Sequence, residues 1–209
     1  MRDIKLLEKK IGYEFQNFKL LQMALTHTSF ANEARHGTKH NERLEFLGDS
    51  VLSILVAEYL YTHSDLPEGD LTRIRASLVC ESALFQFAKQ VELGAYLRLG
   101  NGEEMGGGRQ RPSVVSDAFE AVLAALYLDG GMEAARNFLL PFIQDALAMK
   151  KDDGDYKTKL QEIVQQNPEE HLRYVLLEER GPDHDKCFVV EVLLNSNRVG
   201  LGQGHSKNS

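Results

Sequence analysis

The sequence predicts an all-helical domain followed by a small α+β module of one helix and three strands. Up to about residue 150, hydrophobic residues recur every three or four positions, which is the spacing of the buried side of a helix. A polar segment at 150–155, KKDDGD, ends that pattern. We therefore expect one domain over 1–150, a linker over 151–154 and a second module over 155–209.

Four stretches carry the helical spacing of the first domain, and turn-forming residues separate them. The hydrophobic stretches lie at 20–25, 44–55, 119–126 and 135–142. Glycine or proline clusters lie at 66–69, 106–108 and 129–131. These stretches predict an all-helical domain.

The C-terminal module begins with a predicted helix over 156–166, which Asn167-Pro168 would end. Hydrophobic and β-branched residues then predict strands over 172–179 and 187–194, with a short third strand near Val199. A second helix would be needed to cover this sheet, and we expect that final helix to be missing.

Charge and composition limit the functions that the chain can have. Its 209 residues are 43% hydrophobic, enough for a sizeable core. Lys and Arg number 24 against 31 Asp and Glu, so the net charge is −7. That balance argues against a general polyanion binder, whose affinity comes from neutralising many phosphates. It does not exclude a nucleic-acid enzyme that recruits cations to an acidic site.

The sequence also favours a cytoplasmic protein without membrane segments. No basic and then hydrophobic leader begins the chain. The longest hydrophobic run, 51–60, is interrupted by Ser53 and Glu58 and is shorter than the ~20 residues that span a bilayer. Cys80 and Cys187 have no metal-binding spacing, which is typical of free thiols in a reducing compartment.

Three carboxylates share one side of a predicted helix in the segment NERLEFLGDS, residues 41–50. Glu42 and Glu45 are three positions apart and Glu45 and Asp49 are four apart, so all three lie on neighbouring positions. An ordinary solvated acidic stripe, with Asn41 as the N-cap, would have the same pattern. The hydrophobic residues around them leave little room for a wide polar side, which favours a binding site.

Two further acidic segments could complete such a site. Asp117 and Glu120 precede a hydrophobic stretch, where the alternative is a capping box with Asp117 as the N-cap. Glu68 and Asp70 lie where a turn leads into a helix, and taken alone they look like a helix start. Together, the three segments predict a site for a hard cation such as Mg²⁺, which prefers oxygen ligands.

The surrounding residues favour hydrolysis by an activated water. His27 and His63 lie apart from the acidic segments in the sequence, and no histidine or cysteine is arranged as a nucleophile and base. No glycine-rich phosphate loop of the Walker type is present. A site of carboxylates alone favours metal-activated water attacking a phosphodiester.

At these same segments the chain strongly resembles bacterial ribonuclease III, and the resemblance covers nearly all of it. The motifs of the first domain are ALTHTSF (24–30), HNERLEFLGDSVL (40–52), PEGDLTRIRASLV (67–79) and SDAFEAVLAALYLDGG (116–131). The second module resembles a double-stranded-RNA-binding domain through DYKTKLQEIVQQ (155–166), GPDHDKCF (181–188) and GQGHSK (202–207). The family's lysine-rich final helix would begin at Ser206-Lys207, but Asn208 departs from its pattern, so we expect a truncated module.

The resemblance implies roles for the acidic residues and for one aromatic residue. The residues that would hold the catalytic Mg²⁺, or Mn²⁺, are Glu45, Asp49, Asp117 and Glu120. Asp49 and Glu120 are the pair expected to carry the chemistry. Glu42 and Glu68 match acidic positions that line the family's cleavage valley. Phe46 matches a position that packs across a dimer interface, although plain core packing would also explain it.

The resemblance also implies an activity and its partners. The protein would act as a homodimer on double-stranded RNA, each protomer cutting one strand to leave 5′-phosphate and 3′-hydroxyl ends. Its substrates would be ribosomal RNA precursors and other structured transcripts, read by shape more than by sequence. The residues expected to contact the RNA are Thr158, Gln161, His184 and Lys207. The alternative is a non-catalytic duplex-RNA-binding protein on the same scaffold.

Overall fold

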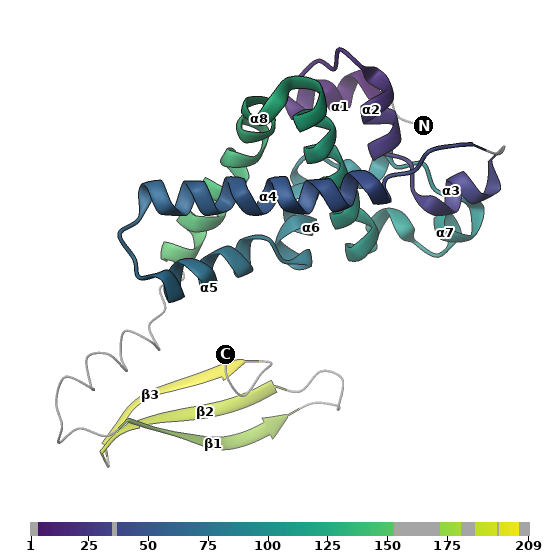
Figure 1. Cartoon of the computed structure of the whole chain (residues 1–209). Coiled ribbons are helices and arrows are strands. Elements are labelled where there is room, and N and C mark those ends of the chain that lie inside the picture. The colour runs from purple at the N-terminus through teal and green to yellow at the C-terminus, as the bar shows by residue number, and fades with distance from the viewer. Residues whose placement is uncertain (1–3, 35–36, 153–171, 181–186, 196, 205–209) are drawn as a thin grey trace. The chain divides into compact units, whose positions relative to one another are not determined.

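The computed structural model of the chain describes residues 4–34, 37–152, 172–180, 187–195 and 197–204. The chain divides into two compact units, Met1–Met149 and Lys150–Ser209. The described part of the first unit is helical, and that of the second contains a three-stranded sheet (Figure 1). The predicted class, an all-helical domain followed by a small β-containing module, is confirmed. The helix predicted over 156–166 lies outside the described residues, and the domain boundaries stay predictions.

The first unit is built from eight described helices and two short 3₁₀ turns. They are α1 (Ile4–Ile11), α2 (Phe18–Ala24), α3 (Thr28–Glu33), α4 (Glu42–His63), α5 (Glu68–Leu78), α6 (Glu81–Gln90), η1 (Leu93–Tyr96), α7 (Asn101–Met105), η2 (Gly108–Gln110) and α8 (Pro112–Asp152). None of the described helices combines the length and the hydrophobicity that crossing a bilayer requires.

The core of this unit contains the hydrophobic sides of α4 and α8, as their residue spacing predicts. Leu52 of α4 and Phe119 of α8 have no exposed surface. The Phe119 ring contacts Phe138 and Phe142 with centroid distances of 5.2 and 5.6 Å, and Phe87 of α6 joins the same cluster. Aromatic packing of this kind holds α6 and the two arms of α8 in fixed relative positions.

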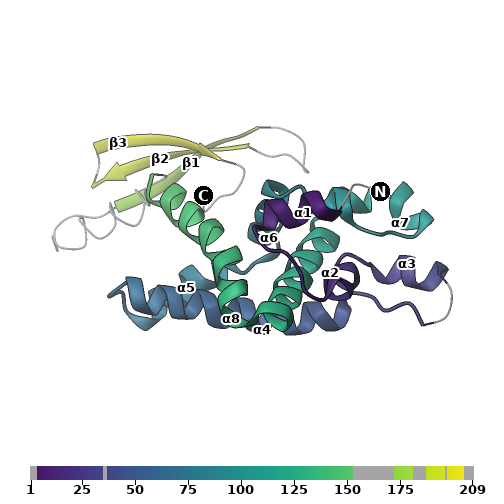
Figure 2. The same ribbon diagram turned by 90° about the horizontal axis from the view of Figure 1, so that it is seen from above.

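Helix α8 consists of two arms that meet at an angle, which Figure 2 shows clearly. Gly131 forms the bend with φ +75° and ψ −174°, a conformation that residues other than glycine rarely adopt. This is the turn that the sequence predicts at 129–131. Beside the bend, the Asp129 carboxylate accepts hydrogen bonds from the Gln16 and Asn17 N–H groups, both at 2.8 Å, and so fixes the start of α2.

The second unit contains the antiparallel strands β1 (Leu172–Arg180), β2 (Cys187–Leu194) and β3 (Asn197–Gly204), in that order across the sheet. Asn195, with φ +56°, makes the tight turn between β2 and β3. The third strand has eight residues and is longer than the short strand predicted near Val199. Its alternate glycines, Gly200, Gly202 and Gly204, carry little strand propensity, which explains the weak sequence signal.

Candidate active site

Three carboxylates from two helices converge on one small volume. Glu45 of α4 and Asp117 and Glu120 of α8 each offer one oxygen, and these three oxygens all lie within 4.8 Å of one another. All three side chains are partly buried. The acidic segments around 45 and 120, which the sequence shows only as separate patterns, are thus brought together. Below we call these three residues the carboxylate cluster.

A glycine allows the two helices to approach closely enough to form the cluster. A Cβ atom at Gly48 would overlap the carbonyl oxygen of Glu120 and lie 2.5 Å from its carbonyl carbon. Gly48 stands between Glu45 and Asp49 on the buried side of α4. The backbone of α8 at Glu120 therefore packs directly on the backbone of α4, beside the acidic residues of that helix.

The start of α4 is fixed by backbone hydrogen bonds. Asn41 occupies the N-cap position that the sequence predicts, but its side chain makes no capping hydrogen bond. Its N–H instead donates to the Thr26 carbonyl at 2.9 Å, and its carbonyl accepts from the N–H groups of Leu44 and Glu45. The segment around Thr26 thereby sets where Glu45 lies.

The capping-box alternative for Asp117 is wrong. Helix α8 begins at Pro112, so Asp117 lies inside the helix rather than at its N-cap. Within a helix the backbone N–H groups bond to carbonyls of the preceding turn, so they do not need a capping carboxylate. The carboxylates of Asp117 and Glu120 are left available to a ligand.

Negative charge on the cluster is unfavourable, because its carboxylates are partly buried and close to one another. Burial, together with the negative charges of Asp49, Asp117 and Glu45, raises the pKa of Glu120 from 4.5 to about 8. Burial and the neighbouring Asp117 and Glu42 also raise the pKa of Glu45. No lysine or arginine of the described residues forms an ion pair with the cluster. A divalent cation would supply the missing positive charge, and three carboxylate oxygens are suitable ligands for it.

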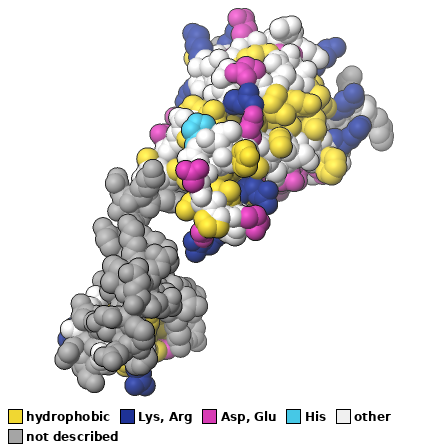
Figure 3. Space-filling view, turned by 60° about the vertical axis from the view of Figure 1, so that its left-hand side comes forward, with side chains coloured by type: hydrophobic (Ala, Val, Ile, Leu, Met, Phe, Trp, Pro, Cys, Tyr) yellow, Lys and Arg dark blue, Asp and Glu magenta, His cyan; other side chains and the backbone are white. Residues whose placement is uncertain are grey.

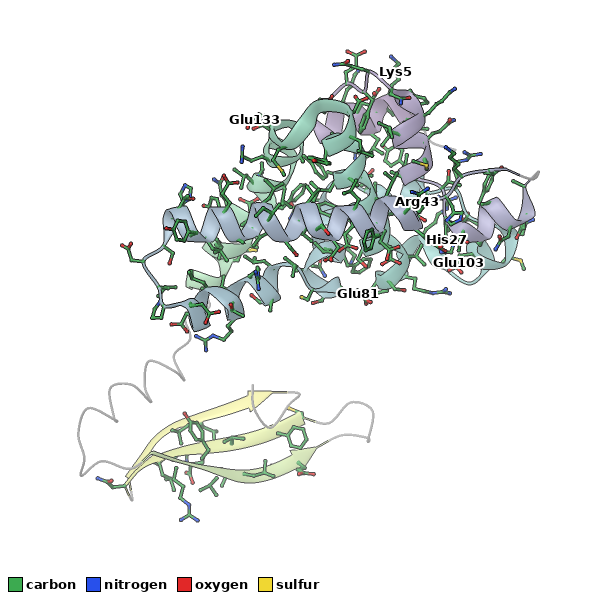
Figure 4. All side chains as sticks on the ribbon, viewed as in Figure 1. Lys5, His27, Arg43, Glu81, Glu103 and Glu133 are labelled. Carbon is green, nitrogen blue, oxygen red and sulfur yellow. The ribbon has the colours of Figure 1, made fainter. Side chains whose placement is uncertain are left out.

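The sequence does not predict that two further residues, His27 and Glu81, lie near the cluster. The pKa of Asp117 is raised by burial and by Glu81, and lowered by His27, so both side chains lie near it. His27 precedes α3 and Glu81 begins α6, as Figure 4 shows. The Nδ1 atom of His27 accepts a hydrogen bond from the Ser29 N–H at 3.3 Å, which orients the ring. No helical spacing connects these residues to the acidic segments, so only the packing reveals them.

The other predicted acidic residues occupy different places. Asp49 is exposed, one turn beyond Glu45, and close enough to raise the pKa of Glu120. Glu42 is exposed at the first position of α4, with a carboxylate oxygen 3.8 Å from Nδ1 of His40.

Glu68 is not brought to the cluster within this chain. It begins α5, beyond the far end of α4, so about 25 Å of helix separates it from Glu45 at ~1.5 Å per residue. Its carboxylate accepts a hydrogen bond from the Thr72 hydroxyl at 2.8 Å. Its expected place along a cleavage valley stays a prediction.

The remaining predicted residues concern partners. Phe46 lies on α4 with 79% of its surface exposed, so it is not a core residue within the chain. The expected RNA contacts Thr158, Gln161, His184 and Lys207 lie outside the described residues.

Comparisons with known families and proteins agree with this arrangement. Residues 17–147 match the family model described as ribonuclease-III-like, and residues 156–209 match the double-stranded RNA binding motif. The class is therefore that of a helical nuclease domain joined to an RNA-binding module.

Individual relatives match over almost the whole chain. Ribonuclease 3 of Caldanaerobacter subterraneus subsp. tengcongensis is 50% identical over 205 residues, covering 96% of this chain and 90% of that protein. Ribonuclease 3 of Clostridium tetani is 46% identical and covers 98% of this chain and 88% of that protein. A solved nuclease domain of ribonuclease III from Campylobacter jejuni has a TM-score of 0.63 and 41% identity, covering 68% of this chain and 97% of that one. The chain belongs to the ribonuclease III family.

Proposed function

We propose that the protein is an endoribonuclease that cleaves double-stranded RNA by attack of a metal-activated water on a phosphodiester. The observation that carries this proposal is the carboxylate cluster, three oxygens within 4.8 Å of one another on two packed helices. Membership of the ribonuclease III family and the double-stranded RNA binding motif support the choice of substrate. The products would be RNA fragments with 5′-phosphate and 3′-hydroxyl ends.

The bound ion that we propose is Mg²⁺, which is abundant in cells, although carboxylate oxygens also suit Mn²⁺. Glu45, Asp117 and Glu120 would hold it, with Asp49 directly or through water. When bound, the cation supplies Lewis acidity and lowers the pKa of a coordinated water.

Asp49 and Glu120 are the residues that we propose act on the reacting groups. Asp49 is exposed, so its carboxylate is accessible to substrate and water. The carboxyl group of Glu120, with a pKa of about 8 before a cation binds, can exchange a proton near neutral pH. Glu42, exposed beside Glu45, and Glu68 would line the path of the RNA.

The cellular role that we propose is the processing of ribosomal RNA precursors and other structured transcripts in the cytoplasm. The C-terminal module would bind the duplex by its shape, through Thr158, Gln161, His184 and Lys207. The motif match over 156–209 includes all four positions.

A long RNA duplex incubated with the protein tests this function. We expect cutting with Mg²⁺ or Mn²⁺ and none with a chelator, because the cluster needs a cation to become competent. Enzymatic mapping of the product ends should find 5′-phosphates and 3′-hydroxyls. Duplex binding without cutting, under any of these cations, would favour the non-catalytic alternative. Equal cutting of single-stranded RNA of the same sequence would contradict the proposed substrate.

We also propose that the protein acts as a homodimer through α4. Phe46, Ile54 and Tyr61 of this helix are 79%, 54% and 79% exposed, and they lie within about a quarter turn of one another at helical spacing. Figure 3 shows hydrophobic side chains gathered on one face of the helical unit. Exposed hydrophobic surface of this kind marks an interaction site. The Campylobacter jejuni structure is described as having a region involved in dimer formation, which supports the same assembly here.

The variant Phe46→Asp is expected to weaken the dimer at least about 100-fold, because a buried charge would replace a central aromatic contact. Sedimentation equilibrium over a range of protein concentrations measures this change. Met105→Asp is the matched control, since Met105 is 87% exposed on α7, away from the α4 row. An unchanged dimer in Phe46→Asp would place the interface elsewhere.

A further inference from the structure

A groove of about 500 Å³ lies between α2, the segment before α4 and Arg98. Its charged lining residues are Lys19, Lys39 and Arg98, and neutral polar side chains such as Asn17 and Gln22 lie among them. No acidic side chain of the described residues lines it. A groove with only positive charge is notable in a chain of net charge −7.

The cations of this groove are available to a ligand. Lys19 and Lys39 are exposed, and neither forms an ion pair with a described residue. Arg98 is held in place, because Nη1 donates to the Thr26 hydroxyl at 3.3 Å and the guanidinium lies 4.2 Å from the centroid of the Phe30 ring. That single hydrogen bond within the described residues leaves most of its five N–H donors for a ligand.

The groove lies next to the carboxylate cluster through a shared backbone segment. Thr26 lines the groove and forms a parallel bridge with Arg98. The next residue, His27, donates its N–H to the Arg98 carbonyl at 3.1 Å and lies near Asp117 of the cluster. Thr26 also anchors Asn41, which precedes α4. Two consecutive residues of one segment therefore lie at the groove and near the cluster, an arrangement that suits an extended ligand.

We propose that this groove holds backbone phosphates of the RNA strand on one side of the scissile bond. This proposal rests on the proposed function and identifies residues that would capture the substrate. The guanidinium of Arg98 suits a phosphate diester by its planar fork of donors, and the two lysines add mobile point charges. The groove reads no base, so its contribution is the same for every duplex sequence.

The double variant Lys19→Gln/Lys39→Gln tests the groove without disturbing Arg98. Each lost phosphate contact lowers the slope of log affinity against log salt by about 1, and weakens binding about fivefold at ~0.15 M salt. We therefore expect RNA affinity some 25-fold lower, measured without divalent cation by fluorescence anisotropy. In cleavage assays KM should rise while kcat changes less than about twofold, because these phosphates are held equally in ground and transition states.

Lys5→Gln/Lys9→Gln is the matched control, with the same charge change on α1 and outside the groove. Equal RNA affinity in the two double variants, with circular dichroism showing both folded, would overturn the groove proposal. Displacement of RNA by millimolar inorganic phosphate at constant ionic strength would assign the groove to a small free anion instead. If the unaltered chain cuts duplex RNA while the groove variant binds normally, only the groove proposal fails. If the unaltered chain neither binds nor cuts, the proposed function fails with it.

Discussion

Glu120→Gln is expected to slow the cutting of duplex RNA at least about a thousandfold, equivalent to roughly 4 kcal/mol of lost transition-state stabilisation. Glutamine keeps the volume of the side chain but removes a negative ligand oxygen from the cluster and a group that can exchange a proton. Single-turnover cleavage with the protein in excess over RNA measures the chemical step. Binding of the duplex should change little.

The same variant is expected to make the cation-free protein more stable at alkaline pH. The pKa of Glu120 is about 8 in the folded chain against 4.5 as its ordinary value, because of burial and of Asp49, Asp117 and Glu45. Between these values the folded state holds a proton that the unfolded state has lost, so stability falls as pH rises through this window. Urea unfolding in chelator at about pH 6 and pH 9 should show a loss of up to a few kcal/mol in the unaltered chain and a smaller one in Glu120→Gln. Added Mg²⁺ should restore stability only in the unaltered chain, and more strongly at higher pH, since the cation displaces the proton.

Glu133→Gln is the matched control for both measurements. Glu133 lies on the same helix, is exposed and pairs with Arg136 at 2.6 Å. It is not part of the carboxylate cluster. An exposed pair contributes ~1 kcal/mol at most, so cutting and pH dependence should match the unaltered chain. Cutting by Glu120→Gln within tenfold of the unaltered rate would remove Glu120 from the chemistry.

The sequence could predict that two acidic helices come together, but it could not predict whether each acidic residue is a helix cap or a ligand. The spacing of 44–55 and 119–126 indicates two buried helices, and both α4 and α8 exist. Whether Asp117 was a cap or a ligand depended on where its helix began. Pro112 at the first position of α8 was the available signal, since proline is frequent there. Five residues of additional helix decide between the two interpretations.

Residues that reach the cluster from elsewhere leave no pattern in the sequence. Glu81 and His27 lie at the starts of short elements and share no periodicity with Asp117, so only tertiary packing identifies them. Glu68 and Glu45 show the reverse case, in which a sequence pattern is present but the residues lie far apart in the fold. Both lie in acidic motifs, yet the 22-residue length of α4 separates them. A second copy packed along α4 could bring the two regions together, which is consistent with the proposed dimer.

The close packing of α4 on α8 predicts that Gly48→Ala damages both stability and activity. A Cβ atom there would lie 2.5 Å from the Glu120 carbonyl carbon and 3.0 Å from its Cα, and both neighbours are helix backbone that cannot rotate away. Alanine favours a helix by ~1 kcal/mol over glycine, but separating two packed helices costs about 1–3 kcal/mol or more. The separation also moves the Glu120 carboxylate relative to Glu45, and a displacement of about 1 Å can cost ~100-fold in rate.

Urea unfolding and single-turnover cleavage of Gly48→Ala should therefore show a net loss of stability and a rate lower by ~10- to 100-fold. Gly69→Ala is the matched control, because Gly69 is also helical, on α5, and a Cβ there meets no atom within 4 Å. It should be as stable as the unaltered chain or more stable by up to ~1 kcal/mol, with normal cutting. If Gly48→Ala behaved like Gly69→Ala, the two helices would have room to spare.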